Sequence, residues 1–330
     1  MLVRANAGVA RMGASHATPA RDASDPAARR MARAVGRETL RRTVVRHFAS
    51  LGRSRRLALV AVVAGLSVIA GGVAYAASGP AIQTITPGSA NQITNLDVLR
   101  QQIRNYYGDP LGTGVIAADS NYAKEASSVA AAGQRWLSTW YRDNWYNASG
   151  TRAIVLDVDD TTLATWNYEL VSNWAYNPTT NGDYVNGELF PAVPGMVKMV
   201  NAAARNGYAI IWITGRPATQ EAVTLGNLTS SDSIGLDAGY PAPTTLIDGE
   251  DGLFTKPAVA DYPPYLKTAC ADEIAAGKSC TTDHYKAATR AHIESLGYEI
   301  VANFGDQFSD LSGGFEDRTF KMPNPNYFLP

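Results

Sequence analysis

Short apolar runs alternate with amphipathic segments from residue 152 onward. Four runs have the length and composition of buried strands: residues 153–156, 208–213, 244–247 and 299–304. Three segments between them are spaced for helices: residues 194–206, 218–227 and 283–296. In the first of these, the proline stands near the start, where a helix tolerates one. Strands that alternate with helices predict an α/β fold with a parallel central sheet, and ligands at the carboxyl ends of its strands.

Two further helices are expected before this region. Asn95 opens one that runs to Tyr107, and residues 121–145 are rich in alanine, with apolar side chains on one helical face. We expect both helices to pack on the main domain as an N-terminal extension. Residues 77–95 carry glycine, serine and proline turn signals and are expected to form a linker, so that the main domain spans residues 96–330.

Charge is distributed unevenly along the 330 residues, which carry a net charge of −1. Residues 1–56 hold thirteen arginines, no lysine and three acidic residues, a balance of +10, so residues 57–330 carry −11. Proteins that bind nucleic acid need a broad basic face, which this acidic body lacks. We therefore expect no nucleic-acid partner.

The basic arm of residues 1–56 leads directly into an apolar segment. Residues 57–73 contain no charge, and a small-x-small tripeptide follows that ends at Ala76. This arrangement is typical of a secretory signal at 57–76. If the uncharged segment is taken to extend through residue 77, it is also long enough for an uncleaved membrane anchor. In both cases the positive charge keeps the arm in the cytoplasm and exports the body. The arm is much longer than the basic region of a signal, which leaves Met31 open as the true start.

Two cysteines, Cys270 and Cys280, are present in the whole chain. An even number of cysteines in an exported protein favours a disulfide, here around a short loop. The alternative is two free thiols. Their spacing does not match a Cys-x-x-Cys metal or redox motif.

Polar residues follow three of the predicted strands directly. They form three pairs: Asp157 with Asp159, Thr214 with Gly215, and Asp306 with Asp310. Because the ends of parallel strands meet at one edge of a sheet, we expect these side chains to lie close together. Paired carboxylates can hold a hard divalent cation, and one can act as a nucleophile while the other exchanges protons. Taken alone, each pair also fits a turn or a helix cap.

Together with Lys286, these residues resemble the haloacid dehalogenase-like (HAD) superfamily. The matching positions are Asp157, Asp159 and Thr161 in the first motif, Thr214 in the second, Lys286 in the third, and Asp306 with Asp310 in the fourth. The stretches TGRP and GDQFSDL look like the branch of acid phosphatases that includes plant vegetative storage proteins and bacterial class B and class C enzymes. In two places the chain departs from that branch: Asp160 stands where glutamate is usual, and the insertion at 250–282 has no counterpart.

The resemblance implies a Rossmann-like HAD fold with a small helical cap at about residues 163–192. It also implies an Mg²⁺-dependent acid phosphatase that hydrolyses phosphate monoesters through an aspartyl-phosphate. Asp157 would be the nucleophile and Asp159 the general acid and base, whose presence favours phosphate transfer over dehalogenation.

The same resemblance assigns the binding residues. Mg²⁺ would be held by Asp157, Asp306 and the backbone carbonyl of Asp159, with Asp310 orienting these ligands from behind. Thr214, Gly215 and Lys286 would bind the phosphate.

Five aromatic residues fall in or near the expected cap: Trp166, Tyr168, Trp174, Tyr176 and Tyr184. They fit either stacking on a nucleoside or aryl leaving group or the packing of the cap itself. The expected partner is a small phosphomonoester, such as a nucleotide or an aryl phosphate. A phosphotransferase of the same site, and a non-catalytic storage or binding protein of the same fold, are the alternatives.

Overall fold

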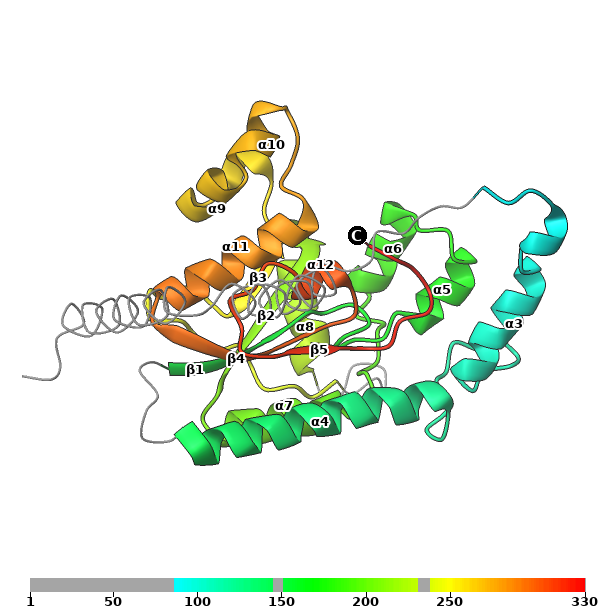
Figure 1. Cartoon of the computed structure of the whole chain (residues 1–330), viewed down its shortest axis with the longest axis horizontal. Coiled ribbons are helices and arrows are strands. Elements are labelled where there is room, and N and C mark those ends of the chain that lie inside the picture. The colour runs from blue at the N-terminus through cyan, green and yellow to red at the C-terminus, as the bar shows by residue number, and fades with distance from the viewer. Residues whose placement is uncertain (1–85, 145–150, 231–237, 330) are drawn as a thin grey trace, which may run out of the picture. The chain divides into compact units, whose positions relative to one another are not determined.

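A parallel five-stranded sheet forms the centre of the computed structural model, which describes residues 86–144, 151–230 and 238–329 (Figure 1). The strands are β1 (Thr151–Leu156), β2 (Ala209–Pro217), β3 (Leu253–Lys256), β4 (Tyr298–Gly305) and β5 (Thr319–Lys321). Their spatial order is β3-β2-β1-β4-β5, and every neighbouring pair is parallel. The predicted α/β fold with a parallel central sheet is confirmed.

Both faces of the central strands are buried. Along β1, Ile154 and Leu156 point into one apolar core, while Ala153 and Val155 point into the other. Successive side chains of a strand face opposite sides, so a strand between two helical layers needs apolar residues at every position. This requirement explains why β1, β2 and β4 read as continuous apolar runs in the sequence.

Helices cover the sheet on its two sides. Figure 1 shows α4 (Asn121–Asn144) and α7 (Met196–Arg205) side by side along one face and α11 (Thr282–Ser295) along the other. On the outer side of α11 lies α9 (Pro264–Ala269), which is followed by α10 (Ala271–Ala275). The predicted disulfide between Cys270 and Cys280 is present here, with the two Cα atoms 5.3 Å apart.

The remaining helices belong to the cap, to the N-terminal extension or to short connections between the strands. Between β1 and α7 lie α5 (Trp166–Ser172) and α6 (Pro178–Asn186), which form the expected helical cap. The expected N-terminal extension consists of α3 (Leu96–Tyr106) together with α4. The other elements are η1 (Ala90–Gln92), η2 (Ala218–Gln220), α8 (Glu221–Thr229), η3 (Val259–Asp261) and α12 (Phe308–Leu311).

Some element predictions differ from the structure. The strand predicted at 244–247 is wrong, because Thr244 alone bonds to Ile210 of β2 before a turn at Leu246 reverses the chain, and the strand is β3 instead. The helix α7 begins two residues later than predicted, because Gly195, at φ 87°, forms its N-cap. The edge strand β5 was not predicted, since only its central residue is buried and a three-residue strand leaves no apolar run.

Several predictions concern residues that the structure does not describe. The basic arm of residues 1–56, the signal or anchor at 57–77 and the first half of the linker lie outside the described residues. By its contacts the chain divides into Met1–Gly71 and Gly72–Pro330, and every described residue belongs to the second unit. Among the residues described, no helix combines the length and the apolar character that a bilayer crossing needs.

Candidate active site

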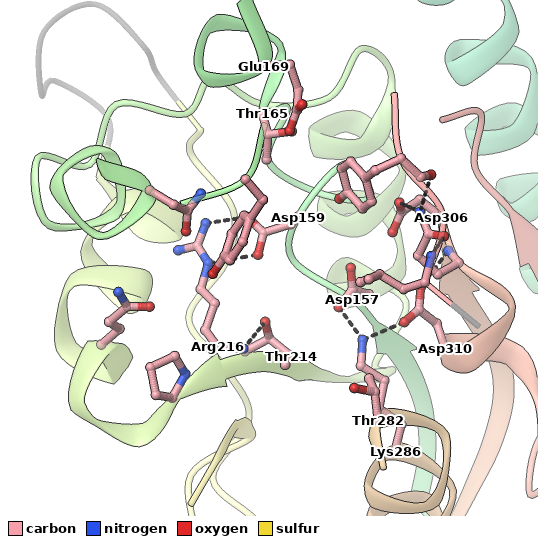
Figure 2. Close-up of a pocket in the computed structure, with 18 of the residues that line it drawn as sticks. Asp157, Asp159, Thr165, Glu169, Thr214, Arg216, Thr282, Lys286, Asp306 and Asp310 are labelled. Carbon is pink, nitrogen blue, oxygen red and sulfur yellow. Dashed lines mark hydrogen bonds and ion pairs between the residues drawn. The ribbon is translucent and has the colours of Figure 1, made fainter. Parts of the chain in front are cut away.

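The carboxyl ends of β1, β2 and β4 meet at one edge of the sheet and line a pocket of about 450 Å³ (Figure 2). All seven site residues predicted from the sequence line this pocket: Asp157, Asp159, Thr214, Gly215, Lys286, Asp306 and Asp310. They come from the ends of three strands, from α12 (Asp310) and from the N-terminal half of α11 (Lys286). The convergence expected from parallel strands is therefore observed.

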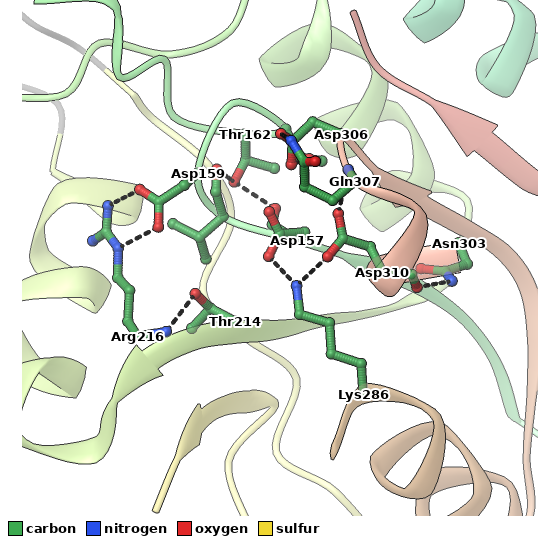
Figure 3. Close-up of polar contacts among 12 residues, drawn as sticks. Asp157, Asp159, Thr162, Thr214, Arg216, Lys286, Asn303, Asp306, Gln307 and Asp310 are labelled. Carbon is green, nitrogen blue, oxygen red and sulfur yellow. Dashed lines mark hydrogen bonds and ion pairs between the residues drawn. The ribbon is translucent and has the colours of Figure 1, made fainter. Parts of the chain in front are cut away.

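Lys286 lies between two carboxylates on one side of the pocket. Its Nζ donates to Asp157 Oδ1 and, at 2.6 Å, to Asp310 Oδ1 (Figure 3). The side chain is buried, and burial lowers the pKa of Lys286, but the two carboxylates outweigh that effect and raise the pKa above its ordinary value. Lys286 is therefore a fixed positive charge at the sheet edge.

Asp157 directly follows β1 and is 6% exposed. Its backbone N–H donates to the carbonyl of Phe304 at 3.0 Å, which continues the pairing of β1 with β4 and fixes where the side chain projects. Burial raises the pKa of Asp157, Lys286 lowers it, and neighbouring carboxylates, Asp310 first, raise it again, so the net shift is upward. An ionised Asp157 therefore needs more positive charge than Lys286 supplies.

The carboxylates of Asp157, Asp306 and Asp310 form a buried cluster. Each offers an oxygen atom, and these atoms lie within 4.8 Å of one another. Lys286 supplies one positive charge against three buried carboxylates, and unbalanced buried charge is costly. Magnesium is a hard cation that binds carboxylate oxygen, so the donor set fits the Mg²⁺ implied by the sequence.

Asp306 follows β4, and its carboxylate receives two amide donors on one oxygen. Gln307 Nε2 and Asn324 Nδ2 each lie 2.6 Å from Oδ2, while Thr161 Oγ1 lies 3.4 Å from Oδ1. Burial and the carboxylates of Asp310 and Asp160 raise the pKa of Asp306, and the two amides oppose that shift. Asn324 was not singled out from the sequence, because it lies in a proline-rich loop without a strand or helix pattern.

Asp310 has a structural role as well as a place in the pocket. Its Oδ2 accepts the backbone N–H of Gln307 at 2.8 Å as part of a capping box on α12, while its Oδ1 accepts from Lys286. The capping interpretation is therefore right for one of its two oxygens. A Cβ atom at Gly305 would lie 2.3 Å from the Cβ of Asp310, so glycine is required there for this close approach.

Asp159 lies on the opposite side of the pocket, paired with Arg216 (Figure 3). The guanidinium donates from Nη2 to Oδ1 at 2.7 Å and from Nε to Oδ2 at 3.0 Å, a bidentate geometry. Arg216 is buried, and its Nη1 also donates to Thr224 Oγ1 at 3.1 Å. Arg216 was not predicted as a site residue, although its place two residues after Thr214 was a usable signal.

Thr214 and Gly215 form the floor of the pocket between these two sides. Thr214 is buried, and its Oγ1 accepts the backbone N–H of Arg216 at 3.2 Å. A Cβ atom added to Gly215 would meet nothing within 4 Å, so the space beside this residue is open. An anion can approach the backbone closely at such a glycine.

The aromatic residues in and near the cap fall into two groups. Trp166 and Tyr168 are buried, and Trp166 stacks on Tyr107 with ring centroids 4.2 Å apart, so the packing interpretation is right for them. Trp174 and Tyr176 line the pocket instead.

Two acidic residues beside the site differ in where they face. Glu169, on the cap side of the pocket in Figure 2, lines the pocket and is buried. Asp160 accepts from the backbone N–H of Thr165 at 3.0 Å and from its Oγ1 at 2.6 Å, which fixes the turn into α5. Glu169 was not predicted from the sequence, where one glutamate in a helix gives no signal.

Comparison with known proteins gives one family. Residues 70–263 and 264–330 match the model of a family described as HAD superfamily, subfamily IIIB (Acid phosphatase). The match covers all the residues of the site.

Curated relatives are plant proteins. The chain is 32% identical over 182 residues to the stem 28 kDa glycoprotein of Glycine max, a match that covers 53% of this chain and 59% of that protein. It is 28% identical over 181 residues to acid phosphatase 1 of Solanum lycopersicum, covering 53% and 58%. It is 27% identical over 180 residues to vegetative storage protein 1 of Arabidopsis thaliana, covering 53% and 55%. The chain thus spans little more than half the length of these relatives.

Among solved structures, the class C acid phosphatase from Bacillus anthracis matches with a TM-score of 0.48 and 19% identity. The match covers 71% of this chain and 87% of that one.

Proposed function

The chain belongs to the HAD superfamily, subfamily IIIB, a family of acid phosphatases, and we propose that it hydrolyses small phosphate monoesters through an aspartyl-phosphate on Asp157. One observation supports the proposal above all others. Asp157 lies in a pocket between Lys286 on one side and Asp159 on the other, at the edge where β1, β2 and β4 end. This arrangement offers a nucleophile, a fixed cation and a second acid to one small anion.

In the first step, an oxygen of Asp157 forms a bond to phosphorus while the bond to the leaving oxygen breaks. Lys286 holds the carboxylate of Asp157 in place and offers positive charge to the transferring oxygens. Mg²⁺, bound by Asp157, Asp306 and the backbone carbonyl of Asp159, would supply further positive charge and reduce the repulsion between two anions. Asp310 accepts a hydrogen bond from Lys286 and keeps it in place. It would also orient the residues that bind Mg²⁺.

Asp159 would carry the proton in both steps. It would protonate the leaving alcohol, and then accept a proton from the water that hydrolyses the aspartyl-phosphate. Both of its oxygens accept one bond each from Arg216 in this structure, and each keeps a second lone pair that can exchange a proton. Arg216 is therefore a positioning residue for the acid.

The remaining phosphate oxygens would bind Thr214 and the backbone at Gly215. Donors of this kind, placed where charge develops, are each worth about 3 kcal/mol of transition-state stabilisation. The substrate's leaving group would extend past Trp174 and Tyr176, which fits a nucleotide or an aryl phosphate.

A storage protein without turnover is a second candidate, because two relatives bear that name. A relative that has lost catalysis would be expected to have a damaged first motif. In this chain Asp157 and Asp159 are both intact and line the pocket. We further propose an exported protein, since the acidic body follows a basic arm and the apolar segment at 57–77.

The test is release of inorganic phosphate from p-nitrophenyl phosphate by the purified full chain across the acid and neutral pH range. We expect release with Mg²⁺, loss of release in EDTA and recovery when Mg²⁺ is added back. Release that persists in EDTA would remove the metal from the proposal. No release under any condition would favour the storage protein.

A further inference from the structure

The two amides that bind Asp306 have their own orientation fixed by the C-terminal segment, residues 324–329. Asn324 Oδ1 accepts the backbone N–H of Asn326 at 2.8 Å, which leaves the NH₂ group of Asn324 to face Asp306. Gln307 Oε1 accepts the backbone N–H of Leu329 at 2.8 Å, which turns its NH₂ group to the same carboxylate. Both amides are therefore held by backbone donors of one segment, in the orientation that lets them donate.

These contacts decide how the Asp306 carboxylate is presented to the pocket. Two donors at 2.6 Å on Oδ2 fix the plane of the carboxylate, and Oδ1 has the longer contact of 3.4 Å with Thr161. Oδ1 is thus the oxygen that is available to a cation beside Asp157 and Asp310. Without the donors, the buried carboxylate would be free to rotate away from its like-charged neighbours.

The same segment is also tied to the cap side of the site. Asn326 Nδ2 donates to the hydroxyl of Tyr107 at 2.9 Å, and Trp174 Nε1 donates to Asn326 Oδ1 at 3.2 Å. Asn326 therefore fixes the position of the segment without contacting Asp306. It is a matched control for Asn324, with the same side chain, two residues away.

We propose that Asn324 is a positioning residue for the divalent-cation site, whose side-chain amide sets the affinity of Asp306 for the cation. The inference rests on the proposed function, because it assumes that Asp306 binds Mg²⁺. Residues that hydrogen-bond to a metal-binding carboxylate typically change metal affinity about 10- to 100-fold when they are removed.

The experiment is a titration of the full chain with Mg²⁺ alone, without substrate. Binding of Mg²⁺ is measured by calorimetry and by the shift in melting temperature. Asn324→Leu keeps the size of the side chain and removes both of its polar groups. Asn324→Ser removes the amide but keeps a small polar side chain. We expect each to weaken Mg²⁺ binding about 10-fold, and Asn326→Ser to stay within about twofold of the wild type. With saturating Mg²⁺, Asn324→Ser should regain most of its kcat.

Three outcomes would overturn the inference. The first is wild-type Mg²⁺ affinity in both Asn324 variants, or in Asn324→Ser if the leucine variant does not fold. The second is an equal loss of affinity in Asn326→Ser, which would assign the effect to the segment as a whole. The third is a wild-type protein that does not bind Mg²⁺, which would remove the metal from the proposed function as well, whereas the first two leave that function intact.

Discussion

Glu169 places a buried carboxyl on the wall of the pocket. Burial, and then the neighbouring Asp159, raise its pKa from 4.5 to about 7. Below that pH the group is neutral, and above it the pocket gains a negative charge that repels a phosphate. Because the folded state holds this proton more tightly than the unfolded chain, the neutral group stabilises the fold at low pH. That contribution is lost as the pH rises from about 4.5 through about 7.

The variant Glu169→Gln should remove this pH dependence. In the wild type we expect KM for p-nitrophenyl phosphate to rise as the pH passes about 7, and in the variant to rise less. The melting temperature of the variant should also fall less between acid and neutral pH. The control is Asp183→Asn, an exposed carboxyl in α6. Identical pH profiles for the wild type and Glu169→Gln would show that Glu169 does not cause this pH dependence.

Single residues of the site were predictable where they stand next to a strand. Asp157, Asp159 and Thr214 follow apolar runs, so topology alone brings them together. Asn324 could not be found in this way, since its contact with Asp306 depends on the path of an irregular loop.

At the scale of elements, α11 holds Asp310 from two points. Lys286 and Arg290 lie four residues apart on one face of this helix, and both are buried. Lys286 binds the side chain of Asp310, and Arg290 Nη1 donates to its carbonyl at 2.7 Å. Arg290 also donates to the carbonyl of Gly314 and pairs with the buried Glu316 at 3.0 Å. The helix therefore fixes the loop that carries Asp310.

Replacing Arg290 with methionine should destabilise the protein strongly. The change keeps much of the apolar stem but leaves Glu316 buried without its cation, a loss of about 3–5 kcal/mol in the free energy of unfolding. Denaturant unfolding of the wild type, Arg290→Met and the exposed control Lys278→Met would measure it. A loss below about 1 kcal/mol would show that the pair does not support the loop.

The elements with long apolar patterns were predicted well, and the short ones were not. The strands β1, β2 and β4 are buried on both faces, so their sequences carry a clear signal. The strand β3 is only four residues long, and the apolar run before it, at 244–247, ends in the exposed Ile247. An apolar run marks a strand only when the fold gives it a partner along its length.

At the scale of the whole molecule, the site is assembled from parts that are far apart in the sequence. Lys286 is 129 residues from Asp157, and the cap and the C-terminal segment close other sides of the same pocket. A buried cluster of carboxylates lowers stability unless it is balanced by cations. A bound divalent cation would supply that balance, as the proposed function requires.

By the proposed mechanism, Asp157 becomes phosphorylated during turnover. The direct measurement is rapid acid quenching of the wild type with an aryl phosphate and Mg²⁺, followed by digestion and mass spectrometry of the peptide that contains Asp157. We expect a phosphoryl group on Asp157 that is absent without Mg²⁺ and absent from Asp157→Asn, with turnover lost in that variant. Turnover without phosphate on this peptide, or an Asp157→Asn protein that releases phosphate like the wild type, would contradict it.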